Sequence, residues 1–204
     1  MNKPTAISKD KLLLVEGNDQ RNFFEAFLSQ IDIADDVQVM NFGGIGDLRK
    51  FLSALVKMPD FSDVQSVGLV RDAENSEVGA VQSVQSSLES AGLPIPTQAG
   101  VNGVDGHPRV GILILPGNGQ PGMLETLVNR TFADTEIDNC ISDFFVCVKK
   151  SATKSTYQKD KARTFAFLAV TPNAHHSVGV AAKQGVVNVQ HGAFNEVRNF
   201  LRRL

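Results

Sequence analysis

The sequence lacks a long apolar run, and this absence excludes an integral membrane protein. No apolar stretch approaches the roughly 18 residues that a candidate membrane-spanning helix needs. The first residues, Met1 to Thr5, also lack the apolar segment of a secretory signal. We therefore expect a cytoplasmic protein that makes no membrane contact.

Cysteine and histidine are scarce. The two cysteines, Cys140 and Cys147, do not form a CxxC pair, and the four histidines are not arranged as a zinc-binding pattern. We expect two reduced, buried thiols rather than a disulfide or a zinc site.

A strong net charge is also absent. With 20 Lys and Arg against 22 Asp and Glu, the formal net charge of −2 provides no general attraction to nucleic acid. Such attraction would have to come from a metal ion or from a local group of basic residues late in the chain. On charge alone, that group is more simply a solvated loop and helix face. Its members are Lys149, Lys150, Lys154, Lys159, Lys161 and Arg163.

What the sequence does contain is a regular alternation of strand-like and helix-like segments. Short apolar runs occur at 11–15, 37–41, 67–70 and 110–115, and segments of helical spacing occur at 19–30, 48–56, 77–90 and from 123. We also expect a strand at 143–148, helices at 156–169 and 193–204, and a flexible loop at 94–108. This alternation predicts an α/β fold with a mainly parallel sheet and helices on both faces.

Acidic residues follow two of the predicted strands. Glu16 ends the first apolar run, and Asp72 and Glu74 follow the third, where strand alternation would direct both side chains to one side. Parallel strand ends meet at one edge, where open α/β sheets bind ligands. Converging carboxylates would repel one another and raise their own pKa values, and a divalent cation resolves that repulsion. The alternative is that these acids only cap the helices that follow.

The motifs around these acids resemble a known domain. Leu14-Val15-Glu16-Gly17 and Val70-Arg71-Asp72-Ala73-Glu74 resemble the Toprim domain of topoisomerases, primases and overcoming-lysogenization-defect (OLD) nucleases. Leu115-Pro116-Gly117-Asn118 and Gly122-Met123-Leu124-Glu125 resemble the third acidic element of OLD-type proteins, and Lys161 stands where they have a late lysine. The chain is also similar, over nearly its whole length, to a small standalone Toprim-like family of unknown function.

Two positions depart from the Toprim pattern. Gln20 stands where an acid is common, and the nearest carboxylate, Asp19, lies one position earlier. The usual Asp-x-Asp is replaced by Asp72-Ala73-Glu74, in which the second side chain is one methylene longer. The first departure weakens the expectation of a second metal site.

The resemblance implies a Rossmann-like Toprim fold and a divalent-metal-dependent nuclease, or a related phosphodiester-processing protein, with Mg²⁺ or Mn²⁺ as cofactor. The metal ligands would be Glu16, Asp72, Glu74, Glu125 and Asp19, and the catalytic residues would be Glu16 and Lys161. In a single domain of residues 1–204, the metal-site core would be 12–130 and a C-terminal extension at 140–204 would carry Lys161. Glu125 and Lys161 also fit ordinary exposed helix positions.

Three functions remain open at this stage. The sequence has no Gly-Lys-Ser/Thr motif, so it lacks the phosphate-binding loop of an ATPase. A nuclease of this kind would therefore cleave nucleic acid either by itself or together with an ATPase partner protein. Gln20 and the mildly acidic charge favour a non-catalytic module that binds a metal, a nucleotide or a partner. The third function is a small-molecule phosphotransfer or hydrolase enzyme. A topoisomerase is not expected, because the single tyrosine, Tyr157, has no dedicated domain around it.

Overall fold

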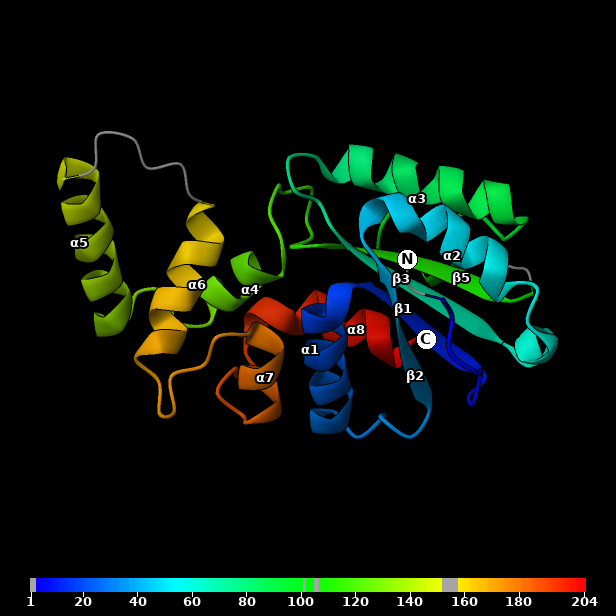
Figure 1. Ribbon diagram of the computed structural model, residues 1–204, viewed down its shortest axis with the longest axis horizontal. Coiled ribbons are helices and arrows are strands. Elements are labelled where there is room, and N and C mark those ends of the chain that lie inside the picture. Colours follow the sequence, from blue (N-terminus) through cyan, green and yellow to red (C-terminus); the bar gives the residue numbers. More distant parts are fainter. Residues whose placement is uncertain (1–2, 101, 105–106, 152–157) are drawn as a thin grey trace.

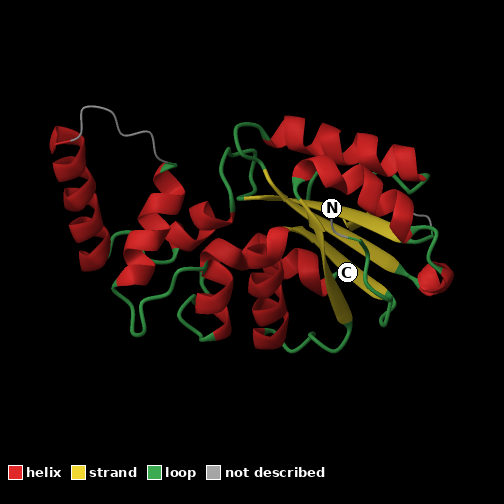
Figure 2. Ribbon diagram, viewed as in Figure 1, coloured by secondary structure: helices red, strands yellow, loops and turns green. Residues whose placement is uncertain are grey.

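The chain folds around a five-stranded sheet with helices on both faces, as the computed structural model in Figure 1 and Figure 2 shows. The structure describes residues 3–100, 102–104, 107–151 and 158–204. Strand order is β2-β1-β3-β5-β4. Four strands are parallel: β1 (Lys11–Glu16), β2 (Val37–Gly43), β3 (Ser66–Asp72) and β5 (Arg109–Leu115), whereas β4 (Asn102–Val104) is antiparallel to β5. The predicted α/β class with a mainly parallel sheet is confirmed.

The two faces of the sheet bury alternate side chains of the same strands. In β1, Leu12 and Leu14 belong to a core beneath α2 (Leu48–Leu55) and α3 (Glu77–Ala91). Leu13 and Val15 belong to the opposite core, with α1 (Gly17–Gln30), α4 (Leu124–Arg130), α7 (Val178–Lys183) and α8 (Asn195–Arg202). Because helices cover both faces, β1 reads as a continuous apolar run rather than an alternating one.

The last helix packs directly on the sheet. A Cβ atom at Gly68 of β3 would lie 2.9 Å from the Leu204 side chain and 3.1 Å from that of Phe200, so any larger residue would require these side chains to shift. The backbone oxygen of Leu204 also accepts hydrogen bonds from Ser66 at 2.7 Å and Arg109 at 2.8 Å. Within the predicted extension at 140–204, α7 and α8 therefore join the main core. α5 (Glu136–Ser151) and α6 (Lys159–Ala169) extend beyond the sheet (Figure 1).

The predicted strand at 143–148 is wrong, because these residues lie within α5. The run from Phe144 to Val148 is rich in aromatic and β-branched residues, which favour strands. The helix forms because Ile137, Ile141 and Phe145 recur every four residues and place one apolar stripe against the core.

The prediction of buried thiols is also wrong. Cys140 and Cys147 are free and exposed on α5. They lie off the stripe of apolar residues that faces the core, which is why both thiols are exposed.

Other sequence expectations are met in part. The expected loop at 94–108 contains the short strand β4, while residues 101, 105 and 106 lie outside the described residues. The helix expected from residue 156 is described from Lys159, and Lys154 and Tyr157 lie outside the described ranges. Among the helices of the described ranges, none has the length and apolar character to cross a membrane.

The close approach of α7 to α1 leads to a stability prediction. A Cβ atom at Gly179 of α7 would lie 2.5 Å from the backbone oxygen of Asp19 and 2.6 Å from Asn22 Cβ, both in α1. Since the backbone of α1 cannot move away without disturbing β1, we expect Gly179→Ala to lower the free energy of unfolding by about 1–3 kcal/mol. Urea denaturation would measure this loss as a lower midpoint.

Gly79→Ala is the matched control for this substitution. Gly79 also lies in the first turn of a helix that begins after a serine N-cap, but its only neighbour is Ser76, at 3.5 Å. Alanine there reduces backbone entropy of the unfolded chain without a clash, so stability should hold or rise slightly. Equal midpoints for the two variants would contradict a tight α1–α7 contact.

Candidate functional site

The residues singled out in the sequence line one pocket of about 490 Å³. It lies at the carboxyl ends of β1 and β3. The chain leaves β1 toward β2 on one side and leaves β3 toward β5 on the other, and ligands bind at such a switch point. The pocket lining includes Glu16, Asp19, Asp72, Glu74, Glu125 and Lys161.

Glu16 is held at the last position of β1. The pairing of β1 with β2 shifts by one residue between Val15 and Glu16, and Gly17 adopts a left-handed φ of 74° where α1 begins. The backbone N–H of Ile45 donates to the Glu16 carboxylate. Gln20 accepts a hydrogen bond from the Glu16 N–H at 3.2 Å and so closes the first turn of α1.

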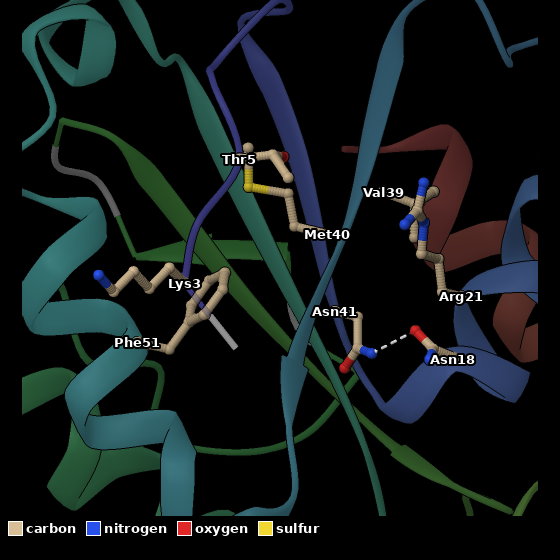
Figure 3. Close-up of a pocket in the computed structure, with 8 residues that line it drawn as sticks. All are labelled: Lys3, Thr5, Asn18, Arg21, Val39, Met40, Asn41 and Phe51. Carbon is tan, nitrogen blue, oxygen red and sulfur yellow. Dashed lines mark hydrogen bonds between the residues drawn. The ribbon is translucent and has the colours of Figure 1, made fainter. Parts of the chain in front are cut away.

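Asn41, which the sequence analysis missed, ties β2 to the start of α1. Its side-chain oxygen accepts hydrogen bonds from Gly17 N–H at 2.9 Å and Gly43 N–H at 2.7 Å. Its amide nitrogen donates to Asn18 at 2.8 Å, the dashed line in Figure 3. An asparagine at the end of a short strand has no sequence signal for this role, because its partners depend on the shifted register.

Figure 3 shows a second hollow, of about 240 Å³, that shares Asn18 with the carboxylate pocket. Its two cationic side chains, Lys3 and Arg21, lie on either side of β2, with the Lys3 ammonium group directed away from the strand and the Arg21 guanidinium extending toward Val39. They therefore do not converge on a single anion.

Asp72 and Glu74 reach the pocket by different routes. Asp72 is the last residue of β3, and its Oδ1 accepts a hydrogen bond from the Leu124 N–H at 3.1 Å. Glu74 lies beyond the strand with a left-handed φ of 51°, and its N–H and C=O pair with those of Gly122 at 2.8 Å each. The expected strand alternation is thus wrong for this pair, because β3 ends before Glu74.

Glu125 and Lys161 are placed together by contacts between α4 and α6. Glu125 is only 8% exposed, which excludes the ordinary exposed position considered for it. Its backbone oxygen accepts a hydrogen bond from Thr164 at 3.3 Å, and Asn129 accepts one from the same hydroxyl at 2.8 Å. Thr126 donates to Asp160, the neighbour of Lys161. These bonds fix α6 so that Lys161 lines the pocket.

Asp19 has a partner within the fold. Its Oδ1 accepts hydrogen bonds from the Gly179 N–H at 2.8 Å and from the Ser177 hydroxyl, both at the beginning of α7. One oxygen of this carboxylate is therefore used to cap a helix, which leaves less of it for an external cation.

The pocket concentrates negative charge in a partly buried place. Burial, followed by the nearby Glu125 and Glu16 carboxylates, raises the pKa of Asp72 to about 7, although the Leu124 N–H and Lys161 act to lower it. Burial likewise raises the pKa of Glu16 and of Glu125. Near neutral pH, Asp72 is therefore only partly ionised, although Lys161 lies close enough to lower its pKa.

The cations of the protein do not neutralise these acids completely. Arg71 lies close enough to influence Glu16, but its guanidinium donates to the backbone oxygen of Ala80 at 3.2 Å. In the part of the chain that the structure describes, neither Arg71 nor Lys161 forms an ion pair with a pocket carboxylate. Glu16 is therefore not enclosed by an arginine.

The donor set fits a hard divalent cation, since carboxylate oxygens are the ligands that Mg²⁺ and Mn²⁺ prefer. Over the described ranges, no three His, Cys, Asp or Glu side chains are placed closely enough to surround one ion. Mg²⁺ commonly takes only one or two carboxylates and completes its shell with water and substrate phosphate. The residues present fit a cation held in this open manner.

The structure adds several pocket residues that the sequence did not indicate. Gln158 and Phe165 line it from the α6 side, and Asn18 and Met123 line it from the sheet side. Only contact between α6 and α4 brings Phe165 to this pocket, so no local motif could have identified it.

Comparison with known proteins places the chain in a family. The family described as "Protein of unknown function (DUF3226)" matches residues 10–204, and the chain belongs to it. No curated protein matches the chain. Among solved structures, it is similar to the C-terminal region of the OLD protein of Xanthomonas campestris pv. campestris. That likeness has a TM-score of 0.40 and 10% identity, and covers 96% of this chain and 86% of the other.

Proposed function

We propose that this member of the DUF3226 family is a divalent-metal-dependent phosphodiester hydrolase of the Toprim type that acts on nucleic acid. The observation that carries the proposal is the single pocket at the carboxyl ends of β1 and β3. There, carboxylates from β1, α1, β3 and α4, together with Glu74, line one cavity with a lysine from α6. Capping of helices alone would not require Glu16, Asp72 and Glu125 to share a cavity that raises their pKa values.

Each residue has a distinct role in this proposal. One or two of Glu16, Asp72 and Glu74 would hold Mg²⁺ or Mn²⁺ directly, with water and substrate phosphate completing its shell. When bound, the metal supplies Lewis-acid stabilisation of the phosphate and an activated water. Lys161 places its ammonium group against the negative charge that develops on the scissile phosphate. Glu125, whose pKa is raised by burial, would orient a ligand at the pocket wall.

A non-catalytic binding module is the second candidate. The observation in its favour is that Asp19 caps α7 and Gln20 closes α1, so the side of the pocket where a second metal would bind has few free ligands. Such a protein would hold one ion with a nucleotide or a partner, without cleaving a phosphodiester. An ATPase protein remains a proposed partner in either case.

The experiment that separates these functions titrates Mg²⁺ and Mn²⁺ against the wild-type protein. Single-stranded DNA, RNA, plasmid DNA and a panel of nucleotides are incubated with each metal or with EDTA. We expect polynucleotide cleavage that depends on the metal and stops with EDTA, with the Glu16→Gln protein purified in parallel to control for contaminating nuclease.

The other outcomes contradict the nuclease proposal in different ways. Calorimetric metal binding without any cleavage would favour the binding module. Hydrolysis of nucleotides alone would favour a small-molecule enzyme. Equal cleavage by Glu16→Gln would show that the activity does not come from this pocket.

A further inference from the structure

We propose that α5 and α6 form a track for a single, unpaired nucleic-acid strand that continues from the carboxylate pocket. In this arrangement one base stacks on Phe165, and the sugar-phosphate backbone beyond it lies along Lys149 and Lys159. The inference rests on the proposed function, because the strand in the track is the one whose phosphodiester enters the pocket.

The first support is the continuity of two hollows across one helix. Lys161 and Phe165 of α6 line the carboxylate pocket. Lys159 and Arg163 of the same helix line a groove of about 250 Å³ whose other wall is α5, including Lys149. The two hollows lie on opposite faces of α6, because residues two positions apart on a helix do not face the same way. Gln158 of the pocket is next in sequence to Lys159 of the groove, so the strand would pass from one hollow to the other across the beginning of α6.

The second support is the distribution of charge on the two helices. The acids of α5 lie in its first half, and one of them, Asp138, pairs with Arg163 and so fixes α5 to α6. The basic residues that remain lie at the end of α5 and the beginning of α6. Among residues that the structure describes, these lysines form no ion pair, and they are Lys149, Lys150, Lys159 and Lys161. Lysines without protein partners beside an acidic pocket suit a polyanion whose phosphates continue past the reacting one.

The third support is an exposed aromatic ring where a base would lie. Phe165 is 44% exposed at the edge of a pocket lined mainly by polar side chains. An aromatic side chain in this position offers a surface on which a base can stack, and stacking accepts every base. The faces of duplex bases are already stacked on their neighbours, whereas an unpaired strand can turn a base onto the ring. The track therefore fits single-stranded DNA or RNA rather than a duplex.

Fluorescence anisotropy with labelled 20-nucleotide probes tests this inference in EDTA, where metal-dependent cleavage cannot occur. We expect single-stranded DNA or RNA to bind about 10-fold or more tightly than the matched duplex. Phe165→Ala should weaken single-strand binding by about 10-fold. Phe144→Ala is the matched control, because its ring is 55% exposed on α5 but lines neither the pocket nor the groove.

A second pair of variants tests the lysines. Lys149→Gln with Lys159→Gln should reduce the slope of log affinity against log salt by about 1.4, the value for two phosphate contacts on a single strand. Lys50→Gln with Lys57→Gln removes the same charge from exposed positions on α2 and just beyond it, and should leave the slope unchanged.

The proposal is overturned if the duplex binds as tightly as the single strand, if no probe binds, or if the track variants behave like their controls. These outcomes are distinct from failure of the proposed function. If the track variants bind normally and cleavage persists, the result would contradict the proposed track but not the proposed nuclease activity. Selective single-strand binding without metal-dependent cleavage would keep the track and support a binding protein.

Discussion

Asp72→Asn is expected to stabilise the metal-free protein at pH 8 while removing its binding of Mg²⁺. Burial raises the pKa of Asp72 from 3.8 to about 7, so the folded protein holds a proton that the unfolded chain has lost between these values. Stability from this group is therefore present in full below pH 3.8, declines as pH rises, and is lost above about pH 7. Asparagine carries no charge, so the free-energy cost of burying an ionised carboxylate at pH 8 is absent in this variant. Its side-chain oxygen can still accept the hydrogen bond from the Leu124 N–H.

The expected gain is about 1–3 kcal/mol at pH 8, less than the full shift implies, because Asp72 keeps some contact with solvent. For a chain of this size, each kcal/mol raises the melting temperature by about 2–4 °C. Thermal melts in EDTA at pH 4, 6 and 8 should show a gain that grows with pH and nearly vanishes at pH 4.

Mg²⁺ should make the wild-type protein more stable than Asp72→Asn, which is the reverse of their order in EDTA. Wild type gains stability from the cation by mass action, whereas Asp72→Asn should show no melting shift and no calorimetric heat. Asp60→Asn is the control for general charge effects, because it alters an exposed acid that precedes the beginning of β3, whereas Asp72 lies at the end of that strand. Unchanged Mg²⁺ affinity in Asp72→Asn would remove this carboxylate from the site, and a loss of stability at pH 8 would contradict its raised pKa.

The core of the site could be predicted from sequence because its residues follow the strands that build the sheet. β1 and β3 are apolar runs that end in Glu16 and Asp72, and parallel pairing of adjacent strands brings such ends to one edge. Each acid is adjacent in sequence to the strand that carries it, so its place at this edge of the sheet follows from the fold class alone. The same logic does not extend to Glu74, whose place depends on a left-handed turn bonded to Gly122.

Residues outside the strands could not be placed by such reasoning. Lys161 was identified only by resemblance, because its position depends on hydrogen bonds from α6 to α4 across more than thirty residues. Asp19 is bonded to Ser177, which lies 158 residues further along. The error in α5 has a different cause, since the apolar stripe at every fourth residue was present in the sequence but the aromatic and β-branched run dominated the interpretation.

Lys161→Met should lower metal-dependent cleavage by about 10²–10³-fold while leaving Mg²⁺ binding nearly unchanged. Lys161 lines the pocket and, within the described ranges, its ammonium group forms no ion pair, so it is available to a substrate phosphate. Methionine has similar length and removes only the charge. Single-turnover cleavage at saturating substrate would measure the loss in rate, and calorimetry would measure the metal.

Two comparison variants test whether the positive charge of Lys161 acts on the reacting phosphate or on the other phosphates of the strand. Lys159→Met removes a lysine two positions away that faces the α5 groove, and it should raise KM with little change in kcat. Glu16→Gln should lose cleavage together with metal affinity. Lys161 also lowers the pKa of Glu16, Asp72 and Glu125, so Lys161→Met should shift the acid limb of the pH–rate profile to higher pH. If Lys161→Met keeps the full kcat, another group must stabilise the charge that develops on the phosphate. Lys161 would then serve only to lower the pKa values of these three carboxyl groups.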